Sequence, residues 1–509
     1  MGTKQNQETL PGGSEKLVRA LGMKEGITMT AGIVVGVGLF TVGANGVGML
    51  GGMIILSSFI AFIISLWPAL LYAEMGTMFP LAGGTYNYAQ KGLTKLVANM
   101  AGWNYVVAVI ASTGGESLAF ANYFGYLMKG FGVEINWDPR ILAAAISILF
   151  IVINFRGIKI AARWQNAFIF FFWACALVWF IYMARSVDLS YYFPDAARGI
   201  PNFGEFVQIT GLVWWCFAGF ELVATIGGEI KFPQINIPRV LIISPFIIFA
   251  ITAMFQWFLV GLVTPTSDNY EMLQVSSAPY AEGLMAAGFV GIPIIILCIG
   301  IVGGTFGTIN PGVGGPARYV FRMAEEGVLP RLMGSIHPKF KTPHVSVVII
   351  GVIILALVST NSIIFVASLS LFSILCCYII AFIAYIGLKI RYRDMKRPFK
   401  APGGVVGAVV SIVIYAVLIS QIGTDALVTG IIYTAAVTVF YLIKTRVFKG
   451  SVTEVNIDEL LLEEMPDPLP EEKKKMDRSF HLWLTIAVAA AAFVIIMYIV
   501  AFLHGTYTV

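Results

Sequence analysis

Long apolar runs separated by short polar segments make up almost the whole chain. Most of these runs are about 17–25 residues long, which is the length that a helix needs to cross roughly 30 Å of hydrocarbon. The pattern therefore predicts an all-α polytopic membrane protein. About thirteen transmembrane helices are expected, near residues 27–49, 52–78, 96–128, 141–156, 161–184, 206–228, 239–264, 284–311, 344–359, 362–389, 404–422, 425–446 and 480–503.

The first and the sixth of these runs are interrupted. The first contains G-I-V-V-G-V-G-L-F from Gly32 onward, and the sixth contains A-G-F-E from Ala218 onward. Unwound backbone persists in hydrocarbon only where it lines a cavity or a binding site, because unsatisfied N–H and C=O groups are costly there. The two runs hold matching places in two five-span units, and an odd number of spans inverts the second unit. The pattern predicts inverted repeats with a substrate site at the two broken helices.

The spans and the polar segments between them suggest how the chain is divided. The expected parts are a cytoplasmic N-terminal segment (1–26), a transport core (27–389) made of repeat 1 (27–184) and repeat 2 (206–389), helices 11 and 12 (404–446), a cytoplasmic linker (447–479) and an extra C-terminal helix (480–509).

The composition excludes a water-soluble globule. Hydrophobic residues make up 58% of the chain and charged residues 12%, with a mean hydropathy of +0.84, whereas soluble domains are usually about 45–50% apolar. The five cysteines all fall in apolar runs without metal or redox spacing, so no disulfide framework is expected. The N-terminal segment lacks the short apolar core of a cleaved signal peptide, so the first span is expected to direct insertion.

Lysine and arginine residues indicate the orientation in the cell membrane. Of the 33 such residues, all but four fall on the side of the N-terminus when the predicted spans are followed in order. Basic residues near span ends resist translocation, so the N-terminus is expected in the cytoplasm, and an odd number of spans then places the C-terminus outside. The net charge of +5 is thus a topology signal, and no basic patch indicates a nucleic-acid partner. The four exceptions are Lys129, Arg140, Arg185 and Arg198.

Four motifs stand in order along the chain: G-I-V-V-G-V-G-L-F (32–40), P-L-A-G-G-T-Y-N-Y (80–88), A-G-F-E-L-V-A-T-I-G-G-E-I-K-F-P-Q-I-N-I-P-R (218–239) and A-R-Y-V-F-R-M-A-E-E-G-V-L-P (317–330). They resemble those of the amino acid–polyamine–organocation (APC) superfamily, in particular its prokaryotic amino acid permeases and antiporters. The resemblance covers about residues 20–446. It implies a five-plus-five inverted-repeat (LeuT-like) core with two further helices, and secondary active transport of amino acids or related amines. The last span lies outside the family's usual twelve.

The first break suits the carboxylate of an amino acid. Backbone N–H groups at a half-helix N-terminus favour a carboxylate, and carbonyls at a half-helix C-terminus favour an ammonium. The carboxylate is expected on the backbone of Gly36, Val37 and Gly38, with Val34 beside it. The family often has Ser in place of Val37, so the loss of that hydroxyl leaves room for a different organic substrate.

The sixth run contributes Trp215, Ala218, Gly219 and Glu221 to the predicted substrate site. A carboxylate inside the bilayer costs on the order of 3 kcal/mol, so a functional role is expected for Glu221. It either pairs with a substrate ammonium or takes up a coupling proton; the alternative is a structural bond across the break. In the family's arginine and putrescine exchangers, a Trp at the place of Trp215 helps to occlude the substrate, and a core aromatic is the alternative.

Three further acids need a role. Glu116 in the third run favours a cationic substrate, such as a basic amino acid or a polyamine; alternatively it lies nearer the outer mouth, bonded to Ser112 or Ser117. Glu74 and Glu229 fall at the predicted cytoplasmic ends of spans, where solvated gate pairs with Lys or Arg are expected.

The coupling ion is left open between a proton and obligate exchange. Thr305 and Thr308 are weak sodium-site candidates, because helix 8 supplies hydroxyls in sodium symporters of this architecture, but such hydroxyls more often bond their own backbone. Some proton-coupled relatives carry a Lys in helix 5, where this chain is expected to have Phe172. No cofactor is predicted, and a proton taken up by Glu221 is the candidate coupling ion.

The alternatives to a transporter find little support. The chain has no G-x-x-x-x-G-K-[ST] loop for nucleotide, no ring of pore-lining charge typical of a channel, and no cluster of His, Cys or acids typical of a membrane enzyme. The prediction is a secondary transporter of neutral amino acids, with cationic amino acids or polyamines as the alternative. It is not expected to be an enzyme, and the sequence leaves its oligomeric state open.

Overall fold

The computed structural model describes residues 19–34, 36, 38–193, 203–447 and 467–507. The described chain is helical, apart from turns, short connections and the isolated bridges Leu21 to Ile230 and Ala82 to Ile226. The α-helices are α1 (Met23–Val34), α2 (Gly43–Leu50), α3 (Ile54–Met78), α4 (Gly84–Gly92), α5 (Lys95–Gly130), α6 (Pro139–Phe155), α7 (Ile158–Met183), α8 (Phe203–Trp214), α9 (Leu222–Thr225), α10 (Pro233–Leu262), α11 (Ser267–Val275), α12 (Pro279–Ala286), α13 (Ile292–Glu325), α14 (His344–Ser359), α15 (Ile363–Arg391), α16 (Gly404–Ser420), α17 (Thr424–Leu442) and α19 (Pro470–Tyr507).

Within the described residues, eight helical stretches are long and apolar enough to cross a membrane, and three shorter apolar helices, α6, α14 and α16, accompany them. Many large apolar side chains on the outer helices are exposed, as expected where the solvent is lipid rather than water. The protein is therefore a multi-pass membrane protein. The eight stretches are Gly38–Met78, Lys95–Gly130, Ile160–Ser186, Pro233–Leu262, Ile292–Glu325, Phe365–Arg391, Thr424–Arg446 and Pro470–His504.

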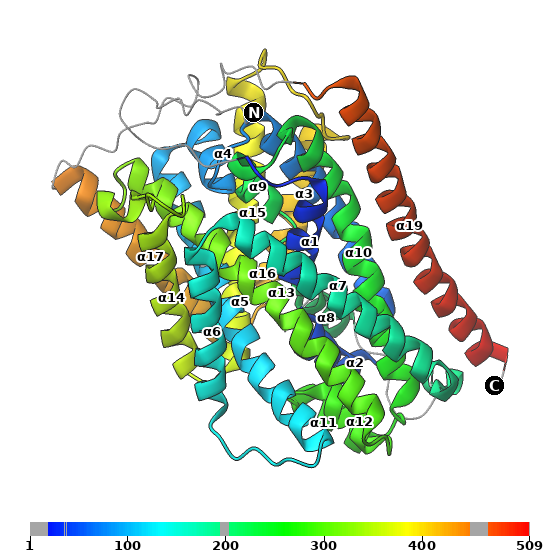
Figure 1. The fold of residues 1–509 in the computed structure, drawn as a ribbon. Coiled ribbons are helices and arrows are strands. Elements are labelled where there is room, and N and C mark those ends of the chain that lie inside the picture. Colours follow the sequence, from blue (N-terminus) through cyan, green and yellow to red (C-terminus); the bar gives the residue numbers. More distant parts are fainter. Residues whose placement is uncertain (1–18, 35, 37, 194–202, 448–466, 508–509) are drawn as a thin grey trace, which may run out of the picture.

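The helices surround a centre formed by α1, α5, α13 and α15. Helix α13 packs against α1, α5 and α7, and α15 packs against α4, α5 and α16. Figure 1 shows α6, α14 and α17 on one side of this centre and α10 and α19 on the other. Many of these contacts join helices that are far apart in the sequence. Residues of several spans are therefore placed around one interior site.

Small residues let the backbones approach closely where α4 meets α15. A side chain on Gly92 would overlap the backbone carbonyl of Ala384, and one on Gly387 would overlap the carbonyl of Gly92. Close backbone approach through glycine is a common way of packing helices in a membrane, where lipid tails are as apolar as the side chains.

Helix α19 runs along one side of the molecule, from the end where α10 begins to the opposite end (Figure 1). Trp483 packs against Trp173 with ring centroids 6.0 Å apart, and Asp477 pairs with Arg239 at the start of α10. The helix begins at Pro470, ten residues before the span expected from hydropathy. Its first turn holds Pro470, Glu471 and Glu472, which favour a helix N-terminus. Most of the predicted linker, residues 448–466, lies outside the described residues.

Candidate functional site

The first interruption lies between α1 and a π-helical turn, Gly38–Val42. Helix α1 ends at Val34, whose carbonyl accepts from the Gly36 N–H at 3.0 Å, and the Phe40 N–H reaches the Gly36 carbonyl at 2.9 Å. The chain here leaves the regular α-helical bond pattern. Val37, one of the predicted substrate-binding residues, lies outside the described residues.

The second interruption follows α8, which ends at Trp214 and continues as a single 3₁₀ turn, Trp215–Phe217. Ala218 is extended, and Gly219 has φ of +107°, a conformation that glycine adopts readily and other residues rarely do. A side chain on Gly219 would also come within 2.9 Å of Ile33 in α1. The two interruptions therefore touch, and a glycine is needed at their contact.

A small cavity of about 40 Å³ lies between the two interruptions. Six predicted site residues line it, together with the sodium candidate Thr308: Val34, Gly38, Glu116, Trp215, Ala218 and Gly219. Ser370 and Ile374 of α15, Ile33 of α1 and Ala108, Val109, Ser112 and Thr113 of α5 complete the lining.

Ser370 holds the indole of Trp215 in place at the edge of this cavity. The Trp215 Nε1–H donates to the Ser370 hydroxyl at 3.1 Å, and that hydroxyl donates to the Ala108 carbonyl at 2.7 Å. This chain of bonds joins α15 and α5 to the second interruption. It gives Trp215 a fixed orientation, which a purely apolar contact would not.

Glu116 is the one charged side chain among the described residues that line the cavity. Its exposed fraction is 2%, and its carboxylate lies directly against Gly36, where an added side chain would overlap both oxygens. Ser117 donates to the Thr113 carbonyl at 3.0 Å and shares a bond with Ser147 at 2.9 Å. Glu116 thus faces the first interruption, and Ser117 has other partners.

Glu221 lies behind the second interruption and does not line the cavity. It is fully buried and precedes the first residue of α9. The Tyr378 hydroxyl donates to Glu221 Oε2 and accepts from the Gly219 N–H at 3.1 Å. Glu221 Oε1 is buried without a hydrogen-bond partner in the described part of the chain. One tyrosine therefore connects the acid to the break. Sequence reasoning missed it, since Tyr378 is one aromatic residue among many in the chain.

The predicted sodium candidates have protein partners. Thr305 donates to the Val302 carbonyl of its own helix at 2.9 Å, and Thr308 donates to the Gly32 carbonyl of α1 at 2.8 Å. Thr308 thus links α13 to α1. Gly36, another predicted site residue, lies beside the cavity because it contacts Glu116.

Gln165 of α7 bridges the same two helices, and sequence reasoning missed it. Its Nε2 donates to the Thr28 carbonyl at 3.1 Å and to the Gly307 carbonyl at 2.7 Å, while its Oε1 accepts from Asn310 at 2.9 Å. Phe172, expected at the position of a coupling lysine, instead stacks on Phe255 with centroids 5.9 Å apart. The available signal for Gln165 was an amide side chain, next to Asn166, near the start of an otherwise apolar run.

Buried ion pairs lie at the end of the molecule where α1 begins. Arg318 pairs with Glu229 at 3.0 Å, with exposed side-chain fractions of 3% and 2%. The backbone carbonyl of Glu229 also accepts from Leu21 at 3.0 Å, just before α1. Arg318 is ten residues beyond Thr308, about 15 Å along α13. The expected gate pair of Glu229 is therefore present but buried, and the expectation of a solvated pair was wrong.

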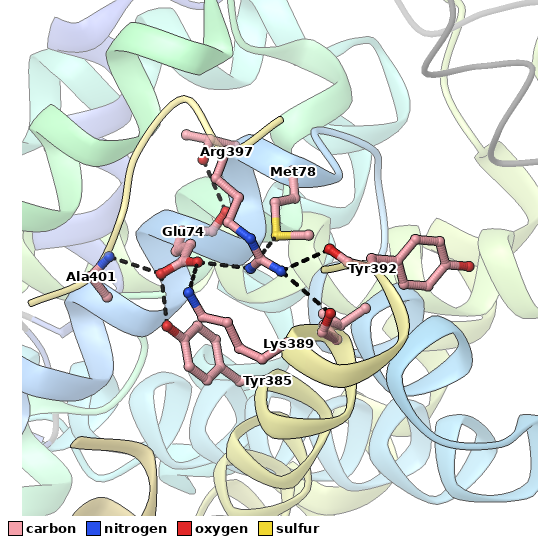
Figure 2. Close-up of polar contacts among 9 residues, drawn as sticks. Glu74, Met78, Tyr385, Lys389, Tyr392, Arg397 and Ala401 are labelled. Carbon is pink, nitrogen blue, oxygen red and sulfur yellow. Dashed lines mark hydrogen bonds and ion pairs between the residues drawn. The ribbon is translucent and has the colours of Figure 1, made fainter. Parts of the chain in front are cut away.

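Glu74 is the centre of another buried ionic cluster. Its carboxylate accepts from Lys389 at 2.5 Å, Arg397 at 2.8 Å and the Tyr385 hydroxyl at 2.7 Å, and Figure 2 shows these side chains converging on it from α15 and the following loop. Glu74 is fully buried, so it too was wrongly expected to be solvated.

Comparison with known proteins identifies the family. A protein-family model with the description "Amino acid permease" matches residues 21–441 of this chain. The chain is 24% identical over 448 residues to the branched-chain amino acid permease BcaP of Bacillus subtilis, covering 85% of this chain and 94% of the relative.

Two further relatives from the same bacterium are similarly distant. The methylthioribose transporter is 26% identical over 409 residues, 76% of this chain and 85% of the relative. The serine/threonine exchanger SteT is 26% identical over 405 residues, 76% of this chain and 87% of the relative. Relatives whose names give different cargoes thus each match 76–85% of this chain.

Proposed function

The chain belongs to the amino acid permease family within the APC superfamily and is a membrane transporter of amino acids rather than an enzyme; on this premise we propose that it is a secondary transporter working by alternating access. The observation that carries the proposal is the cavity enclosed by both helix interruptions and by α5, α13 and α15. Paired interruptions around one interior cavity suit a substrate site that opens to each side in turn.

The proposed architecture is the five-plus-five inverted-repeat core with helices 11 and 12 and a thirteenth span, in the cell membrane with a cytoplasmic N-terminus. The positions of the interruptions support it, because α1 and α8 begin the two proposed repeats. The excess of Lys and Arg on one side of the predicted spans supports the orientation.

In the proposed complex, the substrate ammonium pairs with Glu116 and the substrate carboxylate accepts from backbone N–H groups of the first interruption. Burial strengthens such a charge pair, since few water molecules compete with it. Trp215, fixed by Ser370, covers the cargo. Neutral amino acids satisfy this arrangement with one ammonium and one carboxylate.

The two states of the cycle differ, in this proposal, at the Arg318–Glu229 pair. The pair joins α13 to the segment after α9 and holds the segment before α1, so the cavity opens toward that end only when these contacts break. Glu221 is the proposed proton acceptor, because its Oε1 has no partner in the described chain and its other oxygen contacts the break through Tyr378. Obligate exchange is the alternative, and it has support from the likeness to a serine/threonine exchanger.

A second candidate cargo is a cationic amino acid or a polyamine. The observation in its favour is that a carboxylate is the one charged group lining the described cavity. A dication without a carboxylate would use Glu116 and leave the backbone N–H groups of the first break unoccupied.

The deciding experiment is uptake into proteoliposomes of labelled neutral amino acids, basic amino acids and polyamines, with and without an inward proton gradient. Wild type is compared with Glu116→Gln, Glu221→Gln and the control Glu271→Gln, whose side chain is exposed on α11. Loss of binding in Glu116→Gln, and loss of gradient dependence with retained exchange in Glu221→Gln, are expected. The proposal would be wrong if the wild-type protein neither accumulated nor exchanged any of these compounds.

A further inference from the structure

A second pocket, of about 690 Å³, lies where α15 ends and the loop to α16 begins. Five of its lining side chains are basic and one is acidic. Its position at the end of a membrane-spanning helix is distinct from the cavity between the interruptions. The lining residues are Lys389, Arg393, Asp394, Met395, Lys396, Arg397 and Lys400.

Two of the basic residues are fixed by buried partners and form the wall of the pocket. Lys389 and Arg397 share the carboxylate of Glu74, and Arg397 also donates to the Tyr392 carbonyl at 3.0 Å (Figure 2). Glu74 accepts in addition from the Ala401 N–H at 2.8 Å. Glu74 thereby holds the loop at Arg397 and at Ala401, and its single carboxylate pairs with the two cations Lys389 and Arg397.

The other three basic residues have no protein partner in the described part of the chain. Arg393, Lys396 and Lys400 are exposed, and none of them forms a hydrogen bond or an ion pair with the described part of the chain. Asp394 is the one acid lining this pocket among the described residues. The pocket therefore carries a surplus of positive charge that the described protein does not neutralise.

The helices beside the pocket present apolar side chains to their surroundings. Ile390 of α15 is 76% exposed and Val406 of α16 is 70% exposed. Trp67 of α3 is 43% exposed and donates from Nε1 to the Pro402 carbonyl of the loop at 2.8 Å. Tryptophan is enriched where hydrocarbon meets the headgroup layer. The basic pocket thus borders surfaces suited to lipid chains.

We propose that this pocket binds the phosphate headgroup of an anionic phospholipid, with its acyl chains along the exposed faces of α15 and α16. Arginine and lysine are the usual partners of phosphate oxygens, and basic pockets at helix ends bind anionic headgroups in this way. A free phosphate compound offers the same charge but leaves the bordering apolar faces uncovered. The proposal needs only that the chain spans a membrane and is independent of its cargo.

The test measures which lipids remain bound to the full-length protein. Native mass spectrometry follows wild type extracted from vesicles that contain equal amounts of phosphatidylglycerol and phosphatidylcholine. The variant Arg393→Gln/Lys396→Gln/Lys400→Gln removes the three unpaired charges. The control Lys473→Gln/Lys474→Gln/Lys475→Gln removes the same charge from the exposed start of α19. Wild type and control are expected to retain phosphatidylglycerol about tenfold over phosphatidylcholine, and the pocket variant to lose that preference.

Three results would overturn the assignment. They are equal retention of phosphatidylglycerol by the pocket variant, an equal loss in the control, and displacement of the lipid by glycerol phosphate at concentrations similar to those of short-chain phosphatidylglycerol. The single variants Arg393→Gln, Lys396→Gln and Lys400→Gln each alter an exposed side chain, so they keep the fold and are expected to give graded losses if the triple variant aggregates.

Discussion

Glu116 can occupy the protein interior beside the first interruption because its neighbour Gly36 has no side chain. The group that an added methyl would meet is the end of the Glu116 side chain, which is flexible, rather than backbone. Gly36→Ala is therefore expected to displace the carboxylate while leaving the fold intact. Uptake in proteoliposomes should fall about tenfold or more, which corresponds to about 1.4 kcal/mol of lost binding or transition-state stabilisation.

The matched control for Gly36→Ala is Gly125→Ala in α5, where an added side chain would meet nothing within 4 Å. Both variants should melt within a few degrees of wild type in detergent. Unchanged uptake by Gly36→Ala would show that the position of Glu116 does not matter for transport.

Tyr378 is the second residue whose role can be tested singly. Tyr378→Phe removes the hydroxyl that contacts both Glu221 and the Gly219 N–H, and a hydrogen bond to a charged group is worth about 1.5–3 kcal/mol. Uptake driven by a proton gradient should drop about tenfold or more, measured against gradient-free exchange in the same vesicles.

Tyr88→Phe serves as the control for Tyr378→Phe, because the buried Tyr88 hydroxyl has no hydrogen-bond partner in the described structure. Tyr88→Phe removes the same hydroxyl oxygen as Tyr378→Phe but breaks no hydrogen bond in the described structure. If both variants behave alike, the hydroxyl of Tyr378 has no special part in coupling.

The residues that sequence reasoning found and missed differ in a physical way. Glu116, Glu221 and the glycine breaks stand out because charge and unwound backbone are expensive in hydrocarbon. Gln165 and Tyr378 are ordinary residues in apolar runs, and their importance comes from partners on other helices. Such partners depend on how helices face one another, which periodicity along one chain does not reveal.

Among the elements, α4 and α15 make a contact that is sensitive to added volume. The methyl group of Gly92→Ala would meet the backbone of Ala384, which has nowhere to turn, so the two helices must separate. Overpacking of this kind costs typically about 1–3 kcal/mol. The apparent melting temperature in detergent is expected to fall by several degrees, in contrast to Gly36→Ala. A melting curve that matches that of Gly125→Ala would contradict this account.

The elements themselves were largely predictable, and their ends were not. Hydropathy located the long apolar helices, since each must satisfy its own backbone in lipid. It placed the boundary between the first two spans near residues 49–52, and Gly51, with φ of +56°, ends α2 there before the 3₁₀ turn Gly51–Met53 leads into α3. It did not predict the start of α19, which begins at Pro470, ten residues before the expected span.

At the scale of the whole molecule, the two ends of the described chain lie on opposite sides. Arg19 contacts the carbonyls of Pro80 and Gly227 at 3.3 and 3.0 Å, whereas α19 ends at the far side of the molecule (Figure 1). The distribution of basic residues predicts that the first of these ends is cytoplasmic.

Reporter fusions check this orientation. Alkaline phosphatase joined after Val509 should be active and the same enzyme joined before residue 1 inactive, because it folds only outside the reducing cytoplasm. A fluorescent protein that matures only in the cytoplasm should give the opposite pattern. The reverse result for both reporters would show that the proposed orientation is wrong and that the N-terminus lies outside the cytoplasm.

The amide bridge of Gln165 also bears on how the transporter responds to voltage. Moving one elementary charge across the membrane potential involves about 2.3 kcal/mol per 100 mV, but the bridge from Thr28 to Gly307 consists of amide and carbonyl groups without formal charge. The electric field therefore does little work on this link when α1 and α13 move relative to each other. Any current that accompanies transport then reports on formal charges elsewhere, namely Glu116, Glu221, the Arg318–Glu229 pair and the cargo.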